Sequence, residues 1–247
     1  MSLVDIQFIG SGDAFGSGGR MNTCFMVRAQ SANFLIDCGA TSLVAMRQQN
    51  VDPNLIDYIF ISHLHGDHFA GLVFYLMDAR YISHRENPLK IIGPKGIEKR
   101  VIDTINVMYP GCWDKENTFE IVFIELVHDT QPQFGPISVT PYHAKHLQDG
   151  NDFILRFEVD GKIITFSGDT GWTEDLVAAS NHADLLITEC FFYQETSAFH
   201  MDYGTIFANK ERLDCKQIIL THLGPNALLH QNDMIFDVAF DGMTLSI

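Results

Sequence analysis

The sequence predicts an α/β protein in which two β-sheets pack face to face and helices cover their outer sides, a four-layer αββα arrangement. Short apolar runs rich in β-branched and aromatic residues alternate with helical stretches. Both halves of the chain mix the two kinds of element, so each half is expected to supply a sheet and its helices. No linker, proline-rich tract or charge block divides the 247 residues, which predicts a single domain over residues 1–247.

In the first half, glycine-rich breaks such as residues 11–19 separate short apolar strands. Leu43, Val44 and Met46 are expected on one side of the first helix, and Ile97, Val101, Ile105 and Met108 on one face of the last. We expect strands at 4–10, 23–29, 33–39, 57–62 and 89–94, and helices at 41–50, 69–83 and 96–110.

The second half repeats this pattern. The pair Asp160-Gly161 is a strong signal for a two-residue hairpin, and Thr173 is placed to cap the helix that follows it. A closing hairpin is expected within 236–247, with its turn at Asp241-Gly242. We expect strands at 118–126, 137–144, 152–159, 162–169, 183–190 and 217–223, and helices at 173–180 and 203–213.

The composition limits the classes of molecule that the protein is expected to bind. The net charge is −15, from 16 basic and 31 acidic residues, so bulk nucleic acid and anionic membranes are not expected to bind. A small phosphorylated substrate stays compatible, because a metal pair supplies positive charge locally. The chain shows no signal sequence and no apolar run long enough to span a membrane, and its five scattered cysteines form no C-x-x-C pair. We therefore expect a cytoplasmic protein with free thiols.

The stretch "ISHLHGDH", residues 61–68, concentrates metal-binding side chains where a predicted strand ends. His63 and His65 alternate on an extended segment, so both can face one ion. Gly66 permits a sharp turn, after which Asp67 and His68 can face a second ion. Imidazole nitrogen and carboxylate oxygen suit Zn, Mn or Fe.

A two-metal site needs further ligands, and later strand ends offer them. A single histidine at a strand end is usually an ordinary polar residue, and an aspartate between glycines is usually a turn former. Here, however, the pattern recurs at successive apolar strands in a fixed order. His143 and His146 both follow one strand, and the loop position favours His146. Asp169 and His222 follow two others, and a carboxylate such as Asp169 can bridge two cations.

These motifs resemble those of the metallo-β-lactamase superfamily: H-x-H-x-D-H at 63–68, "SGDT" at 167–170, "LTHL" at 220–223 and "LIDCG" at 35–39. The resemblance covers nearly the whole chain and implies an αββα sandwich with two divalent ions, with Zn the expected metal and Mn or Fe as alternatives. It assigns His63, His65 and His146 to one ion, Asp67, His68 and His222 to the other, and Asp169 to both. His143 has no counterpart. The resemblance also implies a homodimer.

Within the superfamily, His68 argues against a β-lactamase, which generally lacks that histidine. The opening "FIGSGDAFGSGGRMNT" resembles the branch of ribonuclease Z and small phosphodiesterases. Glu189 and His200 match that branch's pair outside the metal site in order and approximate spacing, although "TEC" replaces the usual His-Glu-Ala. In ribonuclease Z a tRNA-binding arm is inserted between the residues that correspond to His146 and Asp169. Here only 22 residues separate the two, which is too short for such an arm.

The sequence therefore predicts a metal-dependent hydrolase in which a hydroxide between two ions attacks a phosphodiester of a small or nucleotide-like substrate. Asp67 is expected to orient the hydroxide, and His200, oriented by Glu189, to protonate the leaving oxygen. Phe192, Tyr193 and Phe199 are candidates for the pocket wall. A lactonase or thioesterase is the enzymatic alternative, and a metal-binding scaffold protein with a decayed site is the non-enzymatic one.

Overall fold

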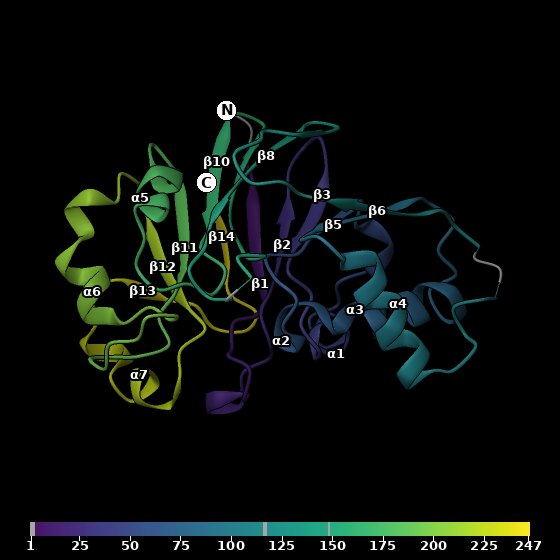
Figure 1. The fold of residues 1–247 in the computed structure, drawn as a ribbon, viewed down its shortest axis with the longest axis horizontal. Helices are drawn as coiled ribbons and strands as arrows, with labels where there is room; N and C mark the ends of the chain where they lie inside the picture. Colours follow the sequence, from purple (N-terminus) through teal and green to yellow (C-terminus); the bar gives the residue numbers. More distant parts are fainter. Residues whose placement is uncertain (1–2, 116–117, 148) are drawn as a thin grey trace.

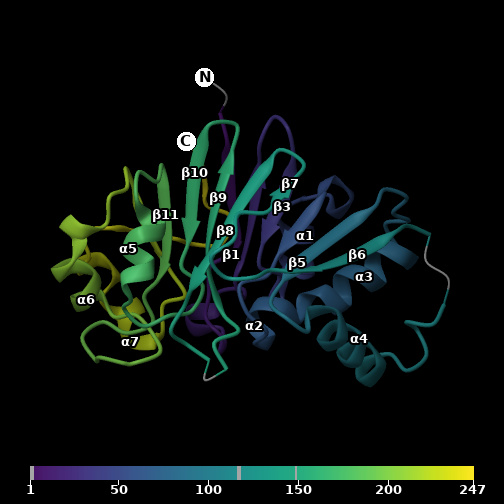
Figure 2. The same ribbon diagram turned by 45° about the horizontal axis from the view of Figure 1, so that its top comes forward.

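A computed structural model describes residues 3–115, 118–147 and 149–247 of the chain. Over these residues, two seven-stranded sheets pack against each other, and helices lie on their outer faces (Figure 1). Turning the molecule shows the strands of both sheets running side by side between the two groups of helices (Figure 2). The predicted αββα layering is confirmed.

The first sheet comes mainly from the amino-terminal half, and the second from the other half. In order across the first sheet, the strands are β14 (Thr244–Ser246), β1 (Asp5–Gly10), β2 (Cys24–Arg28), β3 (Asn33–Ile36), β4 (Tyr58–Phe60), β5 (Leu89–Gly93) and β6 (Ile121–Glu125). Across the second, they are β13 (Asp237–Val238), β12 (Ile218–Thr221), β11 (Leu185–Glu189), β10 (Lys162–Phe166), β9 (Phe153–Val159), β8 (Ile137–His143) and β7 (Gln133–Phe134).

The helices divide between the two outer faces (Figure 1). The first sheet carries α1 (Ser42–Gln48), α2 (Gly66–Phe69), α3 (Gly71–Tyr81) and α4 (Ile97–Met108), and the second lies beside α5 (Glu174–Ser180), α6 (Tyr203–Ala208) and α7 (Pro225–Leu229). Short 3₁₀ turns occupy Ser17–Gly19, Pro53–Leu55, Lys210–Arg212 and Gln231–Asp233. The strand β7 and the helix α7 were not predicted. None of the described helices is both long and apolar enough to cross a membrane.

Aromatic side chains fill the space between the sheets. Phe157 of the second sheet lies 5.3 Å from Phe34 and 5.1 Å from Phe60 of the first, measured between ring centroids. Phe166 contacts Phe25 edge to face at 5.2 Å. All five are buried. Such tilted and edge-on contacts suit the ring quadrupoles, and they lock the two sheets together.

Two predictions about elements are wrong. Residues 236–247 form no hairpin: β13 pairs with β12 in the second sheet, whereas β14 pairs with β1 in the first. The turn at Asp241-Gly242 exists, with Gly242 at φ +88°, but it carries the chain from one sheet to the other. The apolar faces expected for two helices are also not fully buried. Val44 of α1 is 56% exposed, and Met108 of α4 is 43% exposed. A local sequence pattern can locate a turn or a helix. It does not show which strand or sheet the segment packs against.

The parallel strands position the functional residues. β3, β4 and β5 are parallel in the first sheet, and β10, β11 and β12 in the second. Parallel strands point their carboxyl ends toward the same edge of a sheet, where polar side chains can gather. His63, Asp169 and His222 each follow one of these strands within three residues.

Candidate functional site

The predicted metal ligands gather in two groups where the two sheets meet. Within each group, the candidate ligand atoms lie within 4.8 Å of one another. The first group is His63, His65 and His146, and the second is Asp67, His68, Asp169 and His222. Segments far apart in sequence thus bring together all seven residues that the motifs predict.

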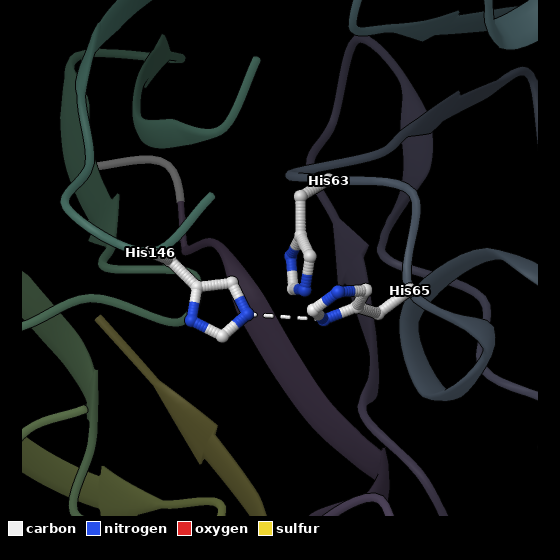
Figure 3. A group of neighbouring side chains, drawn as sticks. All are labelled: His63, His65 and His146. Carbon is white, nitrogen blue, oxygen red and sulfur yellow. Dashed lines mark hydrogen bonds between the residues drawn. The ribbon is translucent and has the colours of Figure 1, made fainter. Parts of the chain in front are cut away.

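The first group converges from two loops (Figure 3). His63 and His65 lie in the loop between β4 and α2, and His146 follows β8. Nε2 of His146 lies 3.0 Å from Nδ1 of His65. Nδ1 of His146 faces the carbonyl oxygen of Phe199 at 3.0 Å, so this nitrogen is the donor and Nε2 presents a lone pair to the group.

The second group has the dimensions of a metal site. Nε2 of His222 lies 3.1 Å from Oδ2 of Asp67, and Nε2 of His68 lies 3.2 Å from the same oxygen. Oδ1 of Asp169 lies 3.2 Å from Nε2 of His68 and 3.6 Å from Nε2 of His222. Ligand atoms about 2.0–2.1 Å from a tetrahedral zinc ion would be about 3.3 Å apart. The four side chains are therefore spaced as the ligands of one ion.

Asp169 lies between the groups. Its Oδ1 belongs to the second group, whereas Oδ2 lies 4.0 Å from Nε2 of His63 and 3.9 Å from Nε2 of His146. One carboxylate oxygen thus faces each group, which is the arrangement that a bridging ligand requires.

Unsatisfied polar atoms test whether metal ions fit this site. Nε2 of His63, Nε2 of His68 and Oδ1 of Asp169 are buried and make no hydrogen bond. Leaving such groups unpaired is costly unless a ligand completes them. The donor set is imidazole nitrogen and carboxylate oxygen, which suits Zn, Mn or Fe. The residues fit two divalent ions.

The electrostatics of the second group favour ionised carboxylates. Burial alone would raise the pKa of Asp67, but the charge of His68 and the hydrogen bond to His222 outweigh it and hold the pKa well below its usual range. Burial would lower the pKa of His68, but Asp169, Asp67 and Asp37 raise it well above its ordinary value. In the first group, burial lowers the pKa of His63 and of His146, so both are neutral and ready to bind metal.

Asp37 is a functional candidate that motif reading did not assign a role. Its Oδ2 accepts a hydrogen bond from Nδ1 of His68 at 2.6 Å, and Ser62 donates to both of its oxygens. This contact directs Nε2 of His68 toward the metal group. Asp37 and His222 both have φ +58°, a strained conformation typical of functional sites. The signal in the sequence was "LIDCG", where Asp37 ends an apolar strand.

Glu189 and His200 lie beside the metal groups. Nδ1 of His200 is 3.1 Å from Oε2 of Glu189 and 4.0 Å from Oδ2 of Asp169. Glu189 is fully buried at the end of β11, and its other oxygen accepts a hydrogen bond from the backbone of Thr170. Burial and the charge of Asp169 raise the pKa of Glu189. The side chain of His200 is 26% exposed, so its imidazole can reach a bound substrate.

His143 lies outside the two metal groups. It ends β8, stacks on His128 with ring centroids 3.6 Å apart, and places Nε2 3.7 Å from Oδ2 of Asp129. Of the aromatic candidates, Tyr193 packs against Tyr203 and His230.

The predicted candidate Phe192 lies near the site, with its ring centroid 6.5 Å from that of His200. Phe191, which the motifs did not single out, comes nearer. Its centroid lies 5.3 Å from that of His200 and 6.1 Å from that of His222. Among the described residues between His146 and Asp169, the regular elements are the two strands of the β9–β10 hairpin, as the sequence predicts.

Comparison with known proteins adds independent findings. A family model described as "Anti-Pycsar protein Apyc1" matches residues 4–237. A ribonuclease Z from Bacillus velezensis is 25% identical, and the alignment covers 99% of each chain. This alignment spans 308 positions, so the relative carries residues that this chain of 247 lacks.

Solved structures share the fold. The metallo-β-lactamase fold protein YhfI from Bacillus subtilis superposes with a TM-score of 0.77 at 20% identity, covering 99% of this chain and 100% of that one. The short form of human tRNase Z superposes with a TM-score of 0.79 at 23% identity, covering 98% and 99%. The fold predicted from the resemblance is confirmed.

Proposed function

This chain belongs to the family of the anti-Pycsar protein Apyc1, and we propose that it hydrolyses a phosphodiester bond in a small or nucleotide-like substrate. It is a metal-dependent hydrolase of the metallo-β-lactamase fold that acts on phosphodiesters. The proposal of a small or nucleotide-like substrate rests on two features. These are the side chains around the metal groups and the short segment between His146 and Asp169, where ribonuclease Z has an RNA-binding arm.

We assign His63, His65 and His146 to one divalent ion and Asp67, His68 and His222 to the other, with Asp169 shared. Zinc is the expected metal, with manganese or iron as alternatives. When bound, the ions lower the pKa of the attacking water and neutralise charge on the phosphoryl oxygens. The predicted homodimer and cytoplasmic location stay predictions.

The protein's own residues supply orientation and proton transfer. Asp67, whose low pKa keeps it ionised, can accept a hydrogen bond from the attacking water and orient it. His200 can donate a proton to the leaving oxygen, and Glu189 holds its ring by the contact to Nδ1. The free nitrogen, Nε2, is therefore the atom that transfers the proton.

One observation carries the choice of reaction: a buried carboxylate and a partly exposed imidazole form a 3.1 Å pair directly beside the two metal groups. An alkoxide leaving group of a phosphodiester needs protonation, and this pair supplies an acid at the required place. The absence of an arm between β9 and β10 favours a small substrate over a folded RNA.

A substrate panel tests the proposal. Protein loaded with zinc or manganese is offered bis-p-nitrophenyl phosphate, 2′,3′- and 3′,5′-cyclic nucleotides, an acyl-lactone and a thioester. We expect turnover of the phosphodiesters, and loss of turnover in the matched variant Asp169→Asn. Hydrolysis of the lactone or the thioester with no phosphodiester cleavage would overturn the proposal.

A further inference from the structure

His222 differs from three other histidines at the site in how its ring is held. His68, His146 and His200 each have a hydrogen-bond partner at Nδ1. Nδ1 of His222 is buried and, among the residues that the structure describes, has no hydrogen-bond partner. No contact at Nδ1 fixes this ring, so the direction of its Nε2 depends on where the backbone of His222 lies.

The backbone of His222 is held by a residue of the other sheet. His222 follows β12, whereas Ser11 directly follows β1. The backbone nitrogen of His222 donates to the carbonyl oxygen of Ser11 at 3.0 Å, and the hydroxyl of Thr221 donates to the same oxygen at 3.2 Å. All three residues are buried. The φ of +58° at His222 persists only where the surroundings impose it, and the Ser11 carbonyl is part of those surroundings.

Asp241 in turn holds Ser11. The backbone nitrogen and the hydroxyl of Ser11 both donate to Oδ1 of Asp241 at 2.9 Å, and the backbone nitrogen of Met21 donates to Oδ2 at 2.8 Å. Hydrogen bonds to a carboxylate are stronger than those between neutral groups. Asp241 lies outside both metal groups, and both of its oxygens already accept hydrogen bonds. Its arrangement therefore suits it to hold the chain rather than to bind an ion.

The turn that carries Asp241 is itself fixed to both sheets. It leads from β13 of the second sheet to β14 of the first. On one side of Asp241, the backbone nitrogen of Ala239 donates to the carbonyl oxygen of Leu220 in β12 at 2.8 Å. On the other side, that of Gly242 donates to the carbonyl oxygen of Phe8 in β1 at 2.7 Å. The turn thus holds Asp241 against the two strands that lead to Ser11 and the metal ligand.

We infer that Asp241 is a positioning residue for the metal ligand His222 and acts through Ser11. The other sheet supplies Asp67 and His68 to the same metal group, so His222 must be held in place relative to them. Losing Asp241 frees Ser11, and a displaced His222 weakens the binding of one ion but not the other. This inference rests on the ligand assignment of the proposed function and adds a residue to it.

Metal affinity tests the inference. Wild-type protein and variants are loaded with zinc, and competition with a chelator gives the affinity for each ion. Asp241→Ala removes all three hydrogen bonds. Asp160→Ala is the matched control, because Asp160 also accepts from a serine hydroxyl and two backbone nitrogens, those of Gln30 and Ser31. Asp160 lies before β10, at the end of that strand opposite to Asp169.

We expect Asp241→Ala to weaken the binding of one ion by about tenfold, as for other residues that orient a metal ligand. Asp160→Ala should lower Tm and leave both affinities unchanged. The absorption spectrum of the cobalt-substituted protein identifies the affected ion. The bands that change in Asp241→Ala should be those that change in His222→Ala, and not those that change in His65→Ala.

Asp241→Asn keeps an oxygen for Ser11 but loses the charge and the acceptor for Met21, so its loss of affinity should be smaller. If Asp241→Ala does not fold, this variant decides, and an unchanged affinity in it would overturn the inference.

No loss in Asp241→Ala, an equal loss for both ions, or the same loss in Asp160→Ala would overturn the inference alone. A wild-type protein that binds no divalent ion would refute the ligand assignment, and the inference with it. Affinity is measured without substrate, so these results do not depend on which bond the enzyme cleaves.

Discussion

At the residue scale, the site depends on which ring nitrogen each histidine presents. Asp37 holds Nδ1 of His68, the carbonyl of Phe199 holds Nδ1 of His146, and Glu189 holds Nδ1 of His200. In each case a hydrogen bond at Nδ1 leaves Nε2 directed toward the reaction site. The partners come from different strands and loops, so orientation is a property of the fold.

His200 can be tested as a proton donor by changing the leaving group. We expect His200→Gln to lower kcat by about 10²–10⁴-fold for an alkoxide leaving group, which must be protonated. The loss should be much smaller for p-nitrophenolate, which leaves without a proton. Steady-state kinetics on both substrates measure the difference. Equal losses on the two would show that His200 acts in some other way.

Asp37 can be tested through metal affinity. Asparagine tolerates the positive φ of this position, so Asp37→Asn removes the charge with little backbone strain. We expect metal affinity to fall by about 10–100-fold because His68 loses its orienting partner. Competition with a chelator gives the affinity. Asp78→Asn, at another buried carboxylate, is the control, and an equal loss there would contradict the assignment.

At the element scale, the segment between β11 and α6 supplies the proposed proton donor and an aromatic side chain to the site. It carries Phe191 and His200, and the carbonyl of Phe199 contacts His146. Its end is held where Asp202 caps α6, accepting from the backbone nitrogen and the hydroxyl of Thr205. A short capped helix therefore holds the proton donor beside the metal groups.

Removing this cap should affect both stability and activity. We expect Asp202→Ala to lower the free energy of unfolding by about 1 kcal/mol and to reduce kcat by loosening the segment that carries His200. Urea denaturation and kinetics measure the two effects. Thr173→Ala removes the cap of α5 instead, so it should lower stability without changing kcat. A similar fall in kcat there would contradict a local role for Asp202.

At the scale of the whole molecule, metal binding and folding are coupled through the buried ligands. Without metal, His68 and His222 have pKa values above their ordinary value of 6.5, because nearby carboxylates outweigh their burial. Their protonated forms stabilise the fold fully below pH 6.5, and this contribution is lost as the pH rises through the folded-state values. Metal binding needs neutral imidazoles and strengthens over the same range.

We therefore expect the increase in Tm on adding zinc to grow from pH 6 to pH 8. Chelation should lower Tm more at the higher pH. Thermal denaturation with and without metal at each pH checks this. A zinc-induced shift that shrinks as the pH rises would contradict the ligand assignment.

Net charge and shape together argue against a folded RNA substrate. The chain carries a net charge of −15, and the 22 residues between His146 and Asp169 include the β9–β10 hairpin, which leaves little length for an arm. We expect precursor tRNA to be cleaved at least 100-fold more slowly than the selected nucleotide substrate under the same salt, because few phosphate contacts are available. Gel assays of tRNA cleavage measure this rate. Comparable rates would refute the preference for small substrates.

The sequence by itself determined the αββα class, most strand and helix positions, and the seven candidate ligands. This was possible because hydrophobic period and strand-end polarity are local properties, read without knowing what packs against them. His63 and Asp169 could be singled out because each follows an apolar strand.

Only the tertiary structure decided which side chains meet. It placed one oxygen of Asp169 toward each metal group and joined His68 to Asp37. It also sent β13 and β14 to different sheets, where a hairpin was expected. These outcomes depend on the packing of segments far apart in sequence. The contacts that stabilise them involve the whole fold, so no short stretch of the chain predicts them.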